Sequence, residues 1–256
     1  MTKRNTQQRR HAILNLLNVQ GEVSVDELVA KLETSAVTIR KDLTALEKNG
    51  LLFRRHGGAI PVPQDISQGG YRKQSPNKQS IAAAAARLIS DHNRIIIDSG
   101  STTIGLIPHL SDKRGLLVMT NSLHLANAIQ DLENEPTLLM TGGTWDPHSE
   151  SFQGRVAEQV LRAYNFDQLF IGADGLDLQR GTTTFNELTG LSQVMAEVSR
   201  EVVVMLESQK LGRIIPNLEL PWSKVNYLVT DDRIPVEAAA TIRAQGVDVI
   251  IAPYAD

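Results

Sequence analysis

Apolar residues near the start of the chain recur at the spacing of helix faces and predict three short helices. The first covers 7–19, with Arg9 and Arg10 near its start, and ends at Gly21. The second begins with Ser24 followed three residues later by Glu27, the pattern of a capping box, and the third follows residue 35, a favourable N-cap serine. The positions expected to face inward are Ala12, Ile13, Leu16 and Leu17, then Val25, Leu28, Val29 and Leu32, then Ala36, Ile39, Leu43 and Leu46.

A short hairpin is expected after the third helix. Gly50 suits the end of that helix, and residues 51–60 contain a turn at Gly57 and Gly58. Two helices joined by a turn of three or four residues are typical of a helix-turn-helix, to which the hairpin adds a wing. The sequence therefore predicts a winged helix-turn-helix domain over 6–61, with the helix-turn-helix at about 23–42.

The rest of the chain alternates short apolar runs with helical patterns. Residues 62–76 are rich in turn formers and predict a linker to a second domain over 77–256. The apolar runs lie at 95–97, 116–119, 137–140, 168–171, 202–206, 227–229 and 247–251, and the helical patterns at 78–90, 102–110, 123–130, 155–164, 188–198 and 236–245. Because the runs are not interrupted by polar positions, they indicate a mostly parallel sheet covered on both faces, so the expected fold class is α/β.

Composition narrows the class of protein. The 256 residues include no cysteine, which excludes disulfides and thiolate metal sites and favours a reducing cytoplasm. No apolar run approaches the about 18 residues that a membrane span needs, so we expect a soluble protein without a membrane partner. The net charge is −3, but residues 1–60 carry +4 and the remainder −7, which indicates that only the N-terminal domain meets a polyanion.

The outward face of the third helix has the chemistry of a helix in a DNA major groove. Its cations suit phosphates and guanine edges, and its methyl groups suit thymine. The arginines of the hairpin are expected to reach phosphate or the minor groove, although an edge strand that uses charge to avoid aggregation remains an alternative. The predicted DNA-binding residues are Ser35, Val37, Thr38, Arg40, Lys41, Thr44, Arg54, Arg55 and His56.

Glycines and polar side chains gather where five of the predicted strands end. Ligands of parallel sheets bind at the carboxyl ends of the strands, and a glycine-and-hydroxyl loop that leads into a helix N-terminus at Thr102 favours an anion. Each cluster alone is typical of a turn or helix cap, whereas five at one edge indicate a binding site. The predicted site residues are Asp98, Ser99, Gly100, Ser101, Thr102, Thr103, Thr120, Asn121, Ser122, Gly142, Gly143, Gly172, Asp174, Gly175, Asn186, Glu187 and Lys210.

These motifs resemble those of the DeoR family of bacterial transcriptional regulators. The resemblance rests on 35–43, on Leu46-Glu47, on Arg54-Arg55-His56-Gly57-Gly58-Ala59 and on the strand-end clusters above, so it covers almost the whole chain. It implies a sensor domain with the fold of ribose-phosphate isomerases and a phosphorylated sugar or polyol as effector, the small molecule that changes DNA affinity. It also implies a repressor of a sugar or polyol operon that acts as a dimer or tetramer.

Two stretches depart from the family pattern. Glu207-Ser208-Gln209-Lys210 stands where the family usually has Asp-Ser-Ser-Lys, and Asp146, Pro147 and His148 stand where a basic residue commonly follows the two glycines. Lys210 and the helix N-terminus at Thr102 are therefore expected to supply most of the attraction for phosphate.

Other functions are open at this point. An active sugar-phosphate isomerase could use Glu187 as base with Asp174 and Lys210, but the side-chain-rich stretch 179–184 would narrow the space for substrate, so no catalytic residue is assigned. The N-terminal domain could instead bind an acidic protein. Trp145 could stack on a sugar or anchor its loop. The six histidines are not closely paired, so neither a metal nor a cofactor is expected.

Overall fold

The computed structural model describes residues 3–48, 51–55, 57–61, 75–147, 149–184, 189–213, 215 and 217–255. The chain divides into two compact units, Met1–Gly70 and Tyr71–Asp256, and each is considered by itself. Within the described residues, no helix is both long enough and apolar enough to cross a bilayer.

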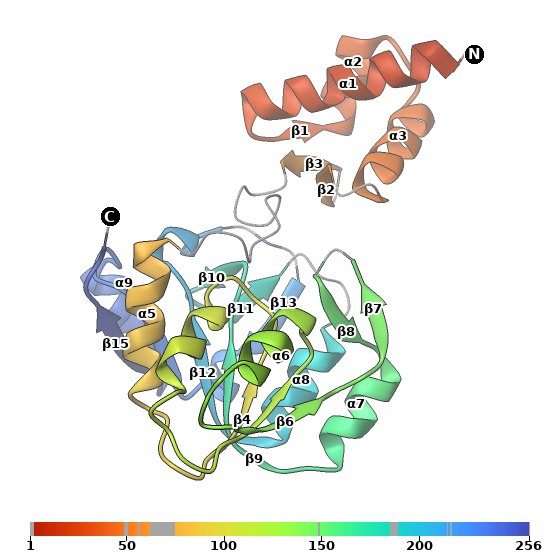
Figure 1. Cartoon of the computed structure of the whole chain (residues 1–256). Coiled ribbons are helices and arrows are strands. Elements are labelled where there is room, and N and C mark those ends of the chain that lie inside the picture. Colours follow the sequence, from red (N-terminus) through yellow and green to blue (C-terminus); the bar gives the residue numbers. More distant parts are fainter. Residues whose placement is uncertain are drawn as a thin grey trace. The chain divides into compact units, whose positions relative to one another are not determined.

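The N-terminal unit is a winged helix-turn-helix, as predicted. Its elements are α1 (Lys3–Gln20), β1 (Val23–Ser24), α2 (Val25–Leu32), α3 (Ala36–Lys48), β2 (Leu52–Arg55) and β3 (Gly58–Pro61). The strands form an antiparallel sheet in the order β1-β3-β2, in which β2 and β3 are the wing (Figure 1). The predicted Gly50 cap and His56 lie outside the described residues.

Most of the inward positions that the helical spacing predicts lie in the core of this unit, which also includes Val23, Leu52 and Ala59. Ile13, Leu28, Ile39 and Leu43 are among its fully buried side chains. The capping box of α2 is formed, since Ser24 and Glu27 exchange hydrogen bonds between side chain and backbone. Strand β1 was not predicted because two residues carry no periodicity.

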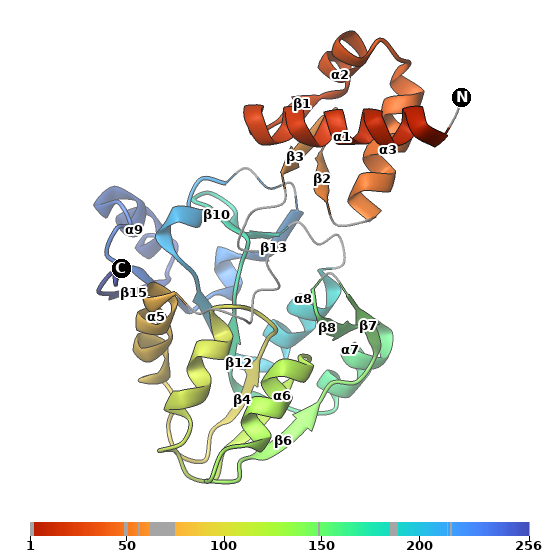
Figure 2. The same cartoon turned by 45° about the horizontal axis from the view of Figure 1, so that its top comes forward.

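The C-terminal unit is built on a seven-stranded parallel sheet. Its strands are β4 (Arg94–Ile97), β5 (Leu117–Thr120), β6 (Thr137–Met140), β9 (Phe166–Ile171), β12 (Ser199–Met205), β14 (Tyr227–Asp231) and β15 (Asp248–Ala252). They lie in the order β15-β14-β12-β9-β4-β5-β6, with every neighbouring pair parallel. Figure 2 labels four of them, β15, β12, β4 and β6. All seven correspond to the apolar runs of the sequence, which confirms the α/β class.

Helices cover both faces of this sheet. One face packs against α5 (Pro76–Ala86), the 3-10 helix η1 (Thr103–His109) and α6 (Leu123–Gln130). The other face packs against α7 (Arg155–Arg162), α8 (Gly190–Glu197) and α9 (Val236–Arg243). Alternate residues of β4 pack into the cores on the two faces of the sheet. Ile95 and Ile97 belong to the core under α5, η1 and α6, and Ile96 belongs to the core under α7, α8 and α9. Because α5 begins at Pro76, the expected linker overlaps it by one residue.

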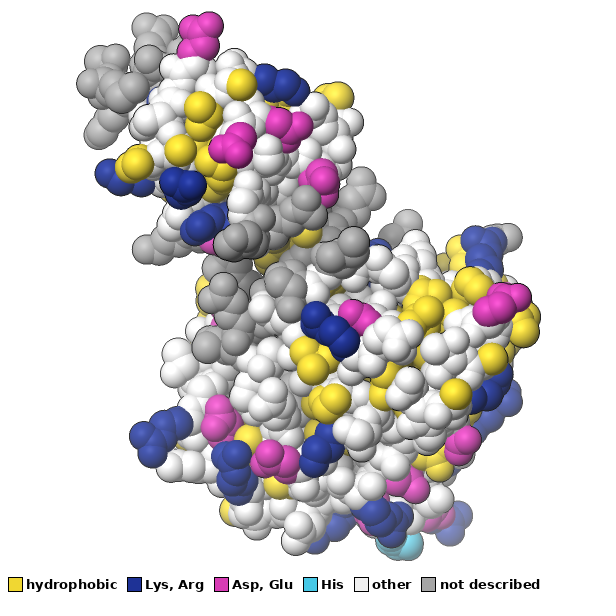
Figure 3. Space-filling view, turned by 180° about the vertical axis from the view of Figure 1, so that it is seen from behind, with side chains coloured by type: hydrophobic (Ala, Val, Ile, Leu, Met, Phe, Trp, Pro, Cys, Tyr) yellow, Lys and Arg dark blue, Asp and Glu magenta, His cyan; other side chains and the backbone are white. Residues whose placement is uncertain are grey.

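Two smaller sheets were not predicted from the periodicity of the sequence. β7 (Thr144–Asp146) and β8 (Ser151–Gln153) form an antiparallel ribbon, and β10 (Gly175–Asp177), β11 (Gly181–Thr184) and β13 (Asn217–Pro221) form a three-stranded sheet. The short 3-10 helices η2 (Ser208–Lys210) and η3 (Trp222–Lys224) flank β13 in the chain. The strands of both sheets are only three to five residues long, which is too short to show a clear periodicity. Figure 3 shows positive and negative side chains interspersed over one face of the unit.

Candidate functional site

The exposed face of α3 carries the cations and small side chains that the sequence places there. Val37 is 61% exposed, and Arg40, Lys41 and Thr44 are exposed as well. Together with Ala45 they line a shallow, open hollow on the N-terminal unit. This exposure confirms the predicted orientation of α3, whereas the contacts of these residues with DNA stay a prediction.

The carboxylate of α3 next to Lys41 faces the interior. Asp42 is 2% exposed and accepts hydrogen bonds from Nε of Arg9 and, at 2.9 Å, from Nε of Arg10. A buried charge requires a partner, so the two arginines neutralise Asp42 and tie α3 to α1. Sequence reasoning misses this cluster because 32 residues separate Arg10 from Asp42 and no local pattern joins them.

Some of the other residues predicted to contact DNA form hydrogen bonds within the N-terminal unit. Ser35 Oγ accepts a hydrogen bond from Thr38 N at 3.2 Å, so Ser35 is the N-cap of α3, as predicted. Arg54 of the wing donates to Thr44 Oγ1 at 2.8 Å. The side chain of Arg55 lies outside the described part of the chain, as does His56.

In the C-terminal unit, the predicted effector loops meet where the winding of the sheet reverses. From β4 the chain adds β5 and β6 on one side, and from β9 it adds β12, β14 and β15 on the other. The loops after β4 and β9, which carry Asp98 and Asp174, therefore flank the topological switch point at which such sheets bind ligands. Asp98 N donates to Phe170 O at 2.9 Å and joins the two strands there.

Asn121, in the loop after β5, links three segments of this edge. Its Nδ2 donates to Asp98 Oδ1 at 2.7 Å, and its Oδ1 accepts from Ser99 N at 2.9 Å. Its backbone oxygen accepts from Phe152 N of β8 at 2.8 Å. On the ribbon, Trp145 is 38% exposed and packs edge-on against Phe152, with the ring centroids 5.4 Å apart. The predicted residues Asp98, Ser99 and Asn121 are thus brought together beside the ribbon.

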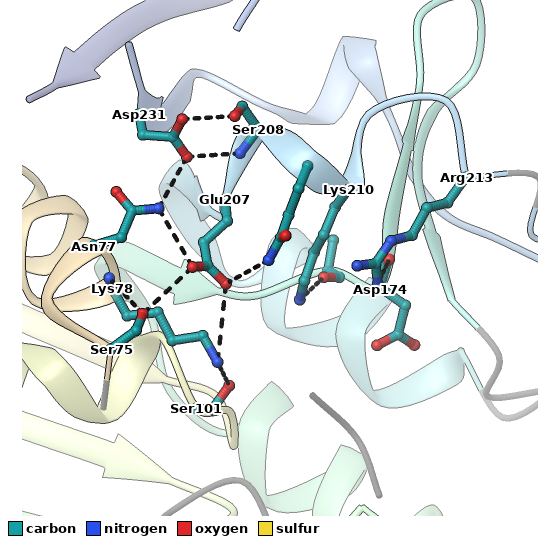
Figure 4. A network of polar contacts seen from close by, with 12 residues as sticks. Ser75, Asn77, Lys78, Ser101, Asp174, Glu207, Ser208, Lys210, Arg213 and Asp231 are labelled. Carbon is teal, nitrogen blue, oxygen red and sulfur yellow. Dashed lines mark hydrogen bonds and ion pairs between the residues drawn. The ribbon is translucent and has the colours of Figure 1, made fainter. Parts of the chain in front are cut away.

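Two buried lysines bring positive charge to the same edge. Lys210 Nζ donates to Ala173 O at 2.8 Å, in the loop after β9. Lys78 Nζ donates to Ser101 Oγ at 2.9 Å and lies 3.9 Å from Glu207 Oε2 (Figure 4). Sequence reasoning misses Lys78, although its place on the buried face of α5, one turn before Ile81, is a signal that could have found it.

The segment 102–110 differs from the expected α-helix. It is the seven-residue 3-10 helix η1, which contains Pro108. Thr102 gives it no side-chain cap. The type of helix therefore differs from the prediction, whereas the attraction of phosphate to its N-terminus stays a prediction. Lys78 is the second source of positive charge.

Several predicted effector residues hold the loops in place. Thr103 Oγ1 donates to Asp98 O at 2.7 Å, Thr120 Oγ1 accepts from Ser122 N at 3.2 Å, and Ser122 Oγ accepts from Leu125 N at the start of α6. These three hydroxyl residues are fully buried, and Thr102 is 3% exposed. Their bonding supports a role in positioning the loops, and direct contact with an effector stays a prediction.

The predicted glycines also lie in these loops. Gly142 has a φ of 59° and Gly143 a φ of 111°, and a Cβ on Gly143 would lie 2.5 Å from Gln153 O. The loop after β6 therefore needs glycine to approach β8. Gly100, Gly172 and Gly175 lie in or next to the loops that follow β4 and β9.

A carboxyl group that the sequence analysis does not single out faces this edge from β13. Glu219 is 8% exposed, and its Oε1 accepts from Ser192 Oγ at 2.9 Å. Burial, followed by repulsion from Asp98 and to a smaller extent Asp174, raises the pKa of Glu219 to about 8. Burial also raises the pKa of Asp98 to about 6, against hydrogen bonds from Asn121 and Ser99 that lower it.

The loop after β12 is bonded to the first turn of α5. Glu207 Oε1 accepts from Asn77 Nδ2 at 3.3 Å and from Ser75 Oγ at 3.4 Å (Figure 4). Asn77 Nδ2 also donates to Asp231 Oδ2 at 3.1 Å, and Ser208 donates twice to Asp231. Burial would raise the pKa of Asp231, but the hydrogen bonds from Ser208 and Asn77 lower it overall. Ser75 is the first described residue after 62–74, so the network joins this loop to the chain that arrives from the N-terminal unit.

In the C-terminal unit, the predicted site residues Asn186 and Glu187 lie outside the described residues, as does His148. Among the residues that are described, no group of three or more His, Asp and Glu side chains could hold a metal ion.

Comparisons with known proteins agree with both units. Residues 9–64 match the model of the DeoR-like helix-turn-helix domain, and residues 73–232 match the model of the DeoR C terminal sensor domain. A putative aga operon transcriptional repressor of Escherichia coli O157:H7 is 36% identical over 96% of this chain and 94% of its own length. The regulator GlpR of Haloferax volcanii is 32% identical over 95% of this chain and 96% of its own length. Among solved structures, ribose 5-phosphate isomerase A of Methanocaldococcus jannaschii aligns over 54% of this chain and 55% of its own, with 18% identity and a TM-score of 0.40.

Proposed function

The chain belongs to the DeoR family of transcriptional regulators, and on this basis we propose that it represses an operon for the use of a sugar or polyol. In this proposal a phosphorylated sugar or polyol binds the C-terminal unit and lowers the affinity of the N-terminal unit for its operator. The relatives at 36% and 32% identity are named as regulators rather than enzymes, which agrees with the expectation that the chain does not catalyse a reaction.

The observation that carries the DNA-binding half is the exposed face of α3. Arg40 and Lys41 offer charge to phosphates and to guanine edges, and Val37 offers methyl groups to thymine. Asp42 is turned inward and neutralised, so it does not repel the phosphates. The exposed face of α3 therefore carries cations and methyl groups, and the nearest carboxylate, Asp42, points away from it. Such a face suits a DNA major groove.

The effector half rests on the two lysines and the loops at the switch point. Lys78 and Lys210 provide positive charge for a phosphate. The carboxyl groups of Asp98, Asp174 and Glu219 offer hydrogen-bond partners to hydroxyl groups. Cations beside carboxyl groups suit a ligand with one phosphate and several hydroxyls, such as a sugar or polyol phosphate.

The coupling between the units passes, in this proposal, through the network around Glu207. That network links the loop of Lys210 to the first turn of α5, where the linker ends. A ligand shifts an equilibrium only as far as its affinity for the two states differs. Ligand that draws Lys78 or Lys210 toward its phosphate would alter the bonds of Glu207 and so the start of α5.

Two or more copies are expected to act together, because a helix-turn-helix dimer reads two half-sites one helical turn apart. The copies are proposed to associate through the C-terminal units. A repressor of genomic DNA works where that DNA lies, which for a bacterial regulator is the cytoplasm.

The experiment first uses the full-length protein to select its operator from a random duplex library. Complexes with the selected duplex are then titrated with sorbitol 6-phosphate, galactitol 1-phosphate, glucosamine 6-phosphate and inorganic phosphate. We expect at least one organic phosphate to release the DNA and to raise the melting temperature of the C-terminal unit.

Lys78→Gln tests the charge assignment, with Lys224→Gln as its control. Lys224 is exposed and precedes β14, so it lies at the amino edge of the sheet, away from the loops. Lys78→Gln should weaken the response to the organic phosphate by roughly tenfold or more, whereas Lys224→Gln should not. Equal responses of the two variants would contradict the proposed phosphate position.

A further inference from the structure

The hydroxyl group of Thr44 on α3 both donates and accepts a hydrogen bond within the N-terminal unit. Thr44 Oγ1 donates its proton to Arg40 O at 2.8 Å and accepts a hydrogen bond from Arg54 Nη1 at 2.8 Å. A hydroxyl has one proton to donate, and here the helix backbone uses it. The hydroxyl of Thr44 is therefore arranged to hold Arg54 rather than to donate to a base.

Glu47, one turn further along α3, holds the same arginine by its backbone. Arg54 N donates to Glu47 Oε1 at 2.9 Å, and Arg54 Nη1 lies 3.8 Å from Glu47 Oε2. Arg54 lies on β2, which is the edge strand of the wing sheet, so this amide has no strand partner on that side. Glu47 satisfies it and fixes the strand against α3.

The two contacts set the direction of an exposed and otherwise flexible side chain. Thr44 lines the hollow on α3 with Arg40 and Lys41. The bond from Arg54 to Thr44 therefore places the guanidinium at the margin of the surface proposed to meet DNA. Ordering a long side chain on binding costs affinity, and a side chain that is already ordered avoids roughly a two- to tenfold loss.

We propose that Thr44 is a positioning residue that orients Arg54 of the wing toward the DNA backbone at the edge of the recognition helix. This inference rests on the proposed function and deepens it, since it makes the wing and α3 one surface. Arg54 contacts phosphate, and Thr44 acts through Arg54.

The test is a double-mutant cycle in the full-length protein. Operator binding is measured by fluorescence anisotropy from about 50 to 200 mM salt, with a duplex that the wild-type protein has selected from a random library. The variants are Thr44→Val, which keeps the shape and removes the hydroxyl, Thr44→Ser, which keeps the hydroxyl, Arg54→Ala, and the double variant Thr44→Val with Arg54→Ala.

Thr44→Val should bind roughly two- to tenfold more weakly with an unchanged salt slope, because the phosphate contact still forms once Arg54 is ordered. Arg54→Ala should bind more weakly and lower the slope by about 0.9, the contribution of one phosphate contact. Thr44→Val should have no further effect in the Arg54→Ala background, and Thr44→Ser should behave as wild type. A Thr that served only helix stability would not show this coupling.

Two results would overturn the inference. The first is an equal loss from Thr44→Val with and without Arg54, since Thr44 would then contact DNA by itself. The second is an unchanged affinity of Thr44→Val. Hydrogen exchange of α3 confirms folding of each variant, and Thr44→Ala, which removes the same hydroxyl without adding a methyl group, must agree with Thr44→Val. Failure of the wild type to select any duplex would instead contradict the proposed function.

Discussion

Glu219 shows how a single buried group can make the stability of this protein depend on pH. Its carboxyl group is buried beside Asp98 and Asp174, so its pKa rises from 4.5 to about 8. The folded protein therefore holds this proton more tightly than the unfolded chain does. The stability that follows is fully present below pH 4.5 and is lost as the pH rises through about 8, by roughly 3–5 kcal/mol.

Glu219→Gln keeps the shape and the neutral state of the protonated acid. We expect this variant to unfold with a flatter pH dependence between about pH 5 and pH 9, and to exceed the wild type in stability above about pH 8. The pKa of Asp98 rises to about 6, so this group should give the stability a smaller dependence on pH below about pH 6. The measurement is denaturant unfolding followed by tryptophan fluorescence, since both Trp145 and Trp222 belong to the C-terminal unit.

The control is Glu237→Gln on the exposed surface of α9, which should keep the wild-type pH dependence. An unaltered pH dependence in Glu219→Gln would show that the buried carboxyl group does not bind the proton in this range.

Individual site residues follow from the sequence only where a motif marks them. Asp98, Asn121 and Lys210 belong to polar clusters at strand ends, and the structure places each at one edge of the sheet. Lys78 is marked only by its place on the buried face of α5, and Glu219 is an isolated polar residue within a strand that no local pattern marks. Their positions depend on packing between segments far apart in the chain.

At the scale of elements, the attachment of α3 to α1 depends on a buried cluster of charges. Asp42 has two arginine partners, and the side chain of Arg9 is only 9% exposed. Removing the carboxylate leaves Arg9 buried without its partner, which typically costs about 3–5 kcal/mol. The cluster therefore determines how firmly α3 is held at its working angle.

We expect Asp42→Ala to lower the protection of α1 and α3 against hydrogen exchange by roughly 3–5 kcal/mol in the full chain. Asp26→Ala is the matched control, because Asp26 is exposed in the first turn of α2 and its loss should cost less than about 1 kcal/mol. If the two variants exchange alike, the cluster contributes nothing to the attachment of α3.

Elements with a clear periodicity could be predicted from the sequence, and those without it could not. The seven buried strands and the three N-terminal helices have unbroken apolar runs or helical spacing, and all are present. The ribbon β7–β8 and the sheet of β10, β11 and β13 have short strands whose pairing is set by tertiary contacts. Segment 102–110 has helical spacing, but its glycine and its Pro108 favour the tighter 3-10 turn.

In the whole molecule, the two units have separate proposed tasks. The N-terminal unit holds the exposed cationic face of α3, and the C-terminal unit holds the lysines and carboxyl groups at the switch point. Loss of DNA contacts should therefore leave effector binding intact. This separation is the central claim, because a regulator needs two distinct sites that communicate.

The most direct test is the operator affinity of Lys41→Ala, measured together with the thermal shift that the most effective organic phosphate produces in the C-terminal unit. The account predicts a loss of affinity of roughly five- to 150-fold with an unchanged thermal shift. A Lys41→Ala protein that protects the selected operator as well as the wild type does would contradict it.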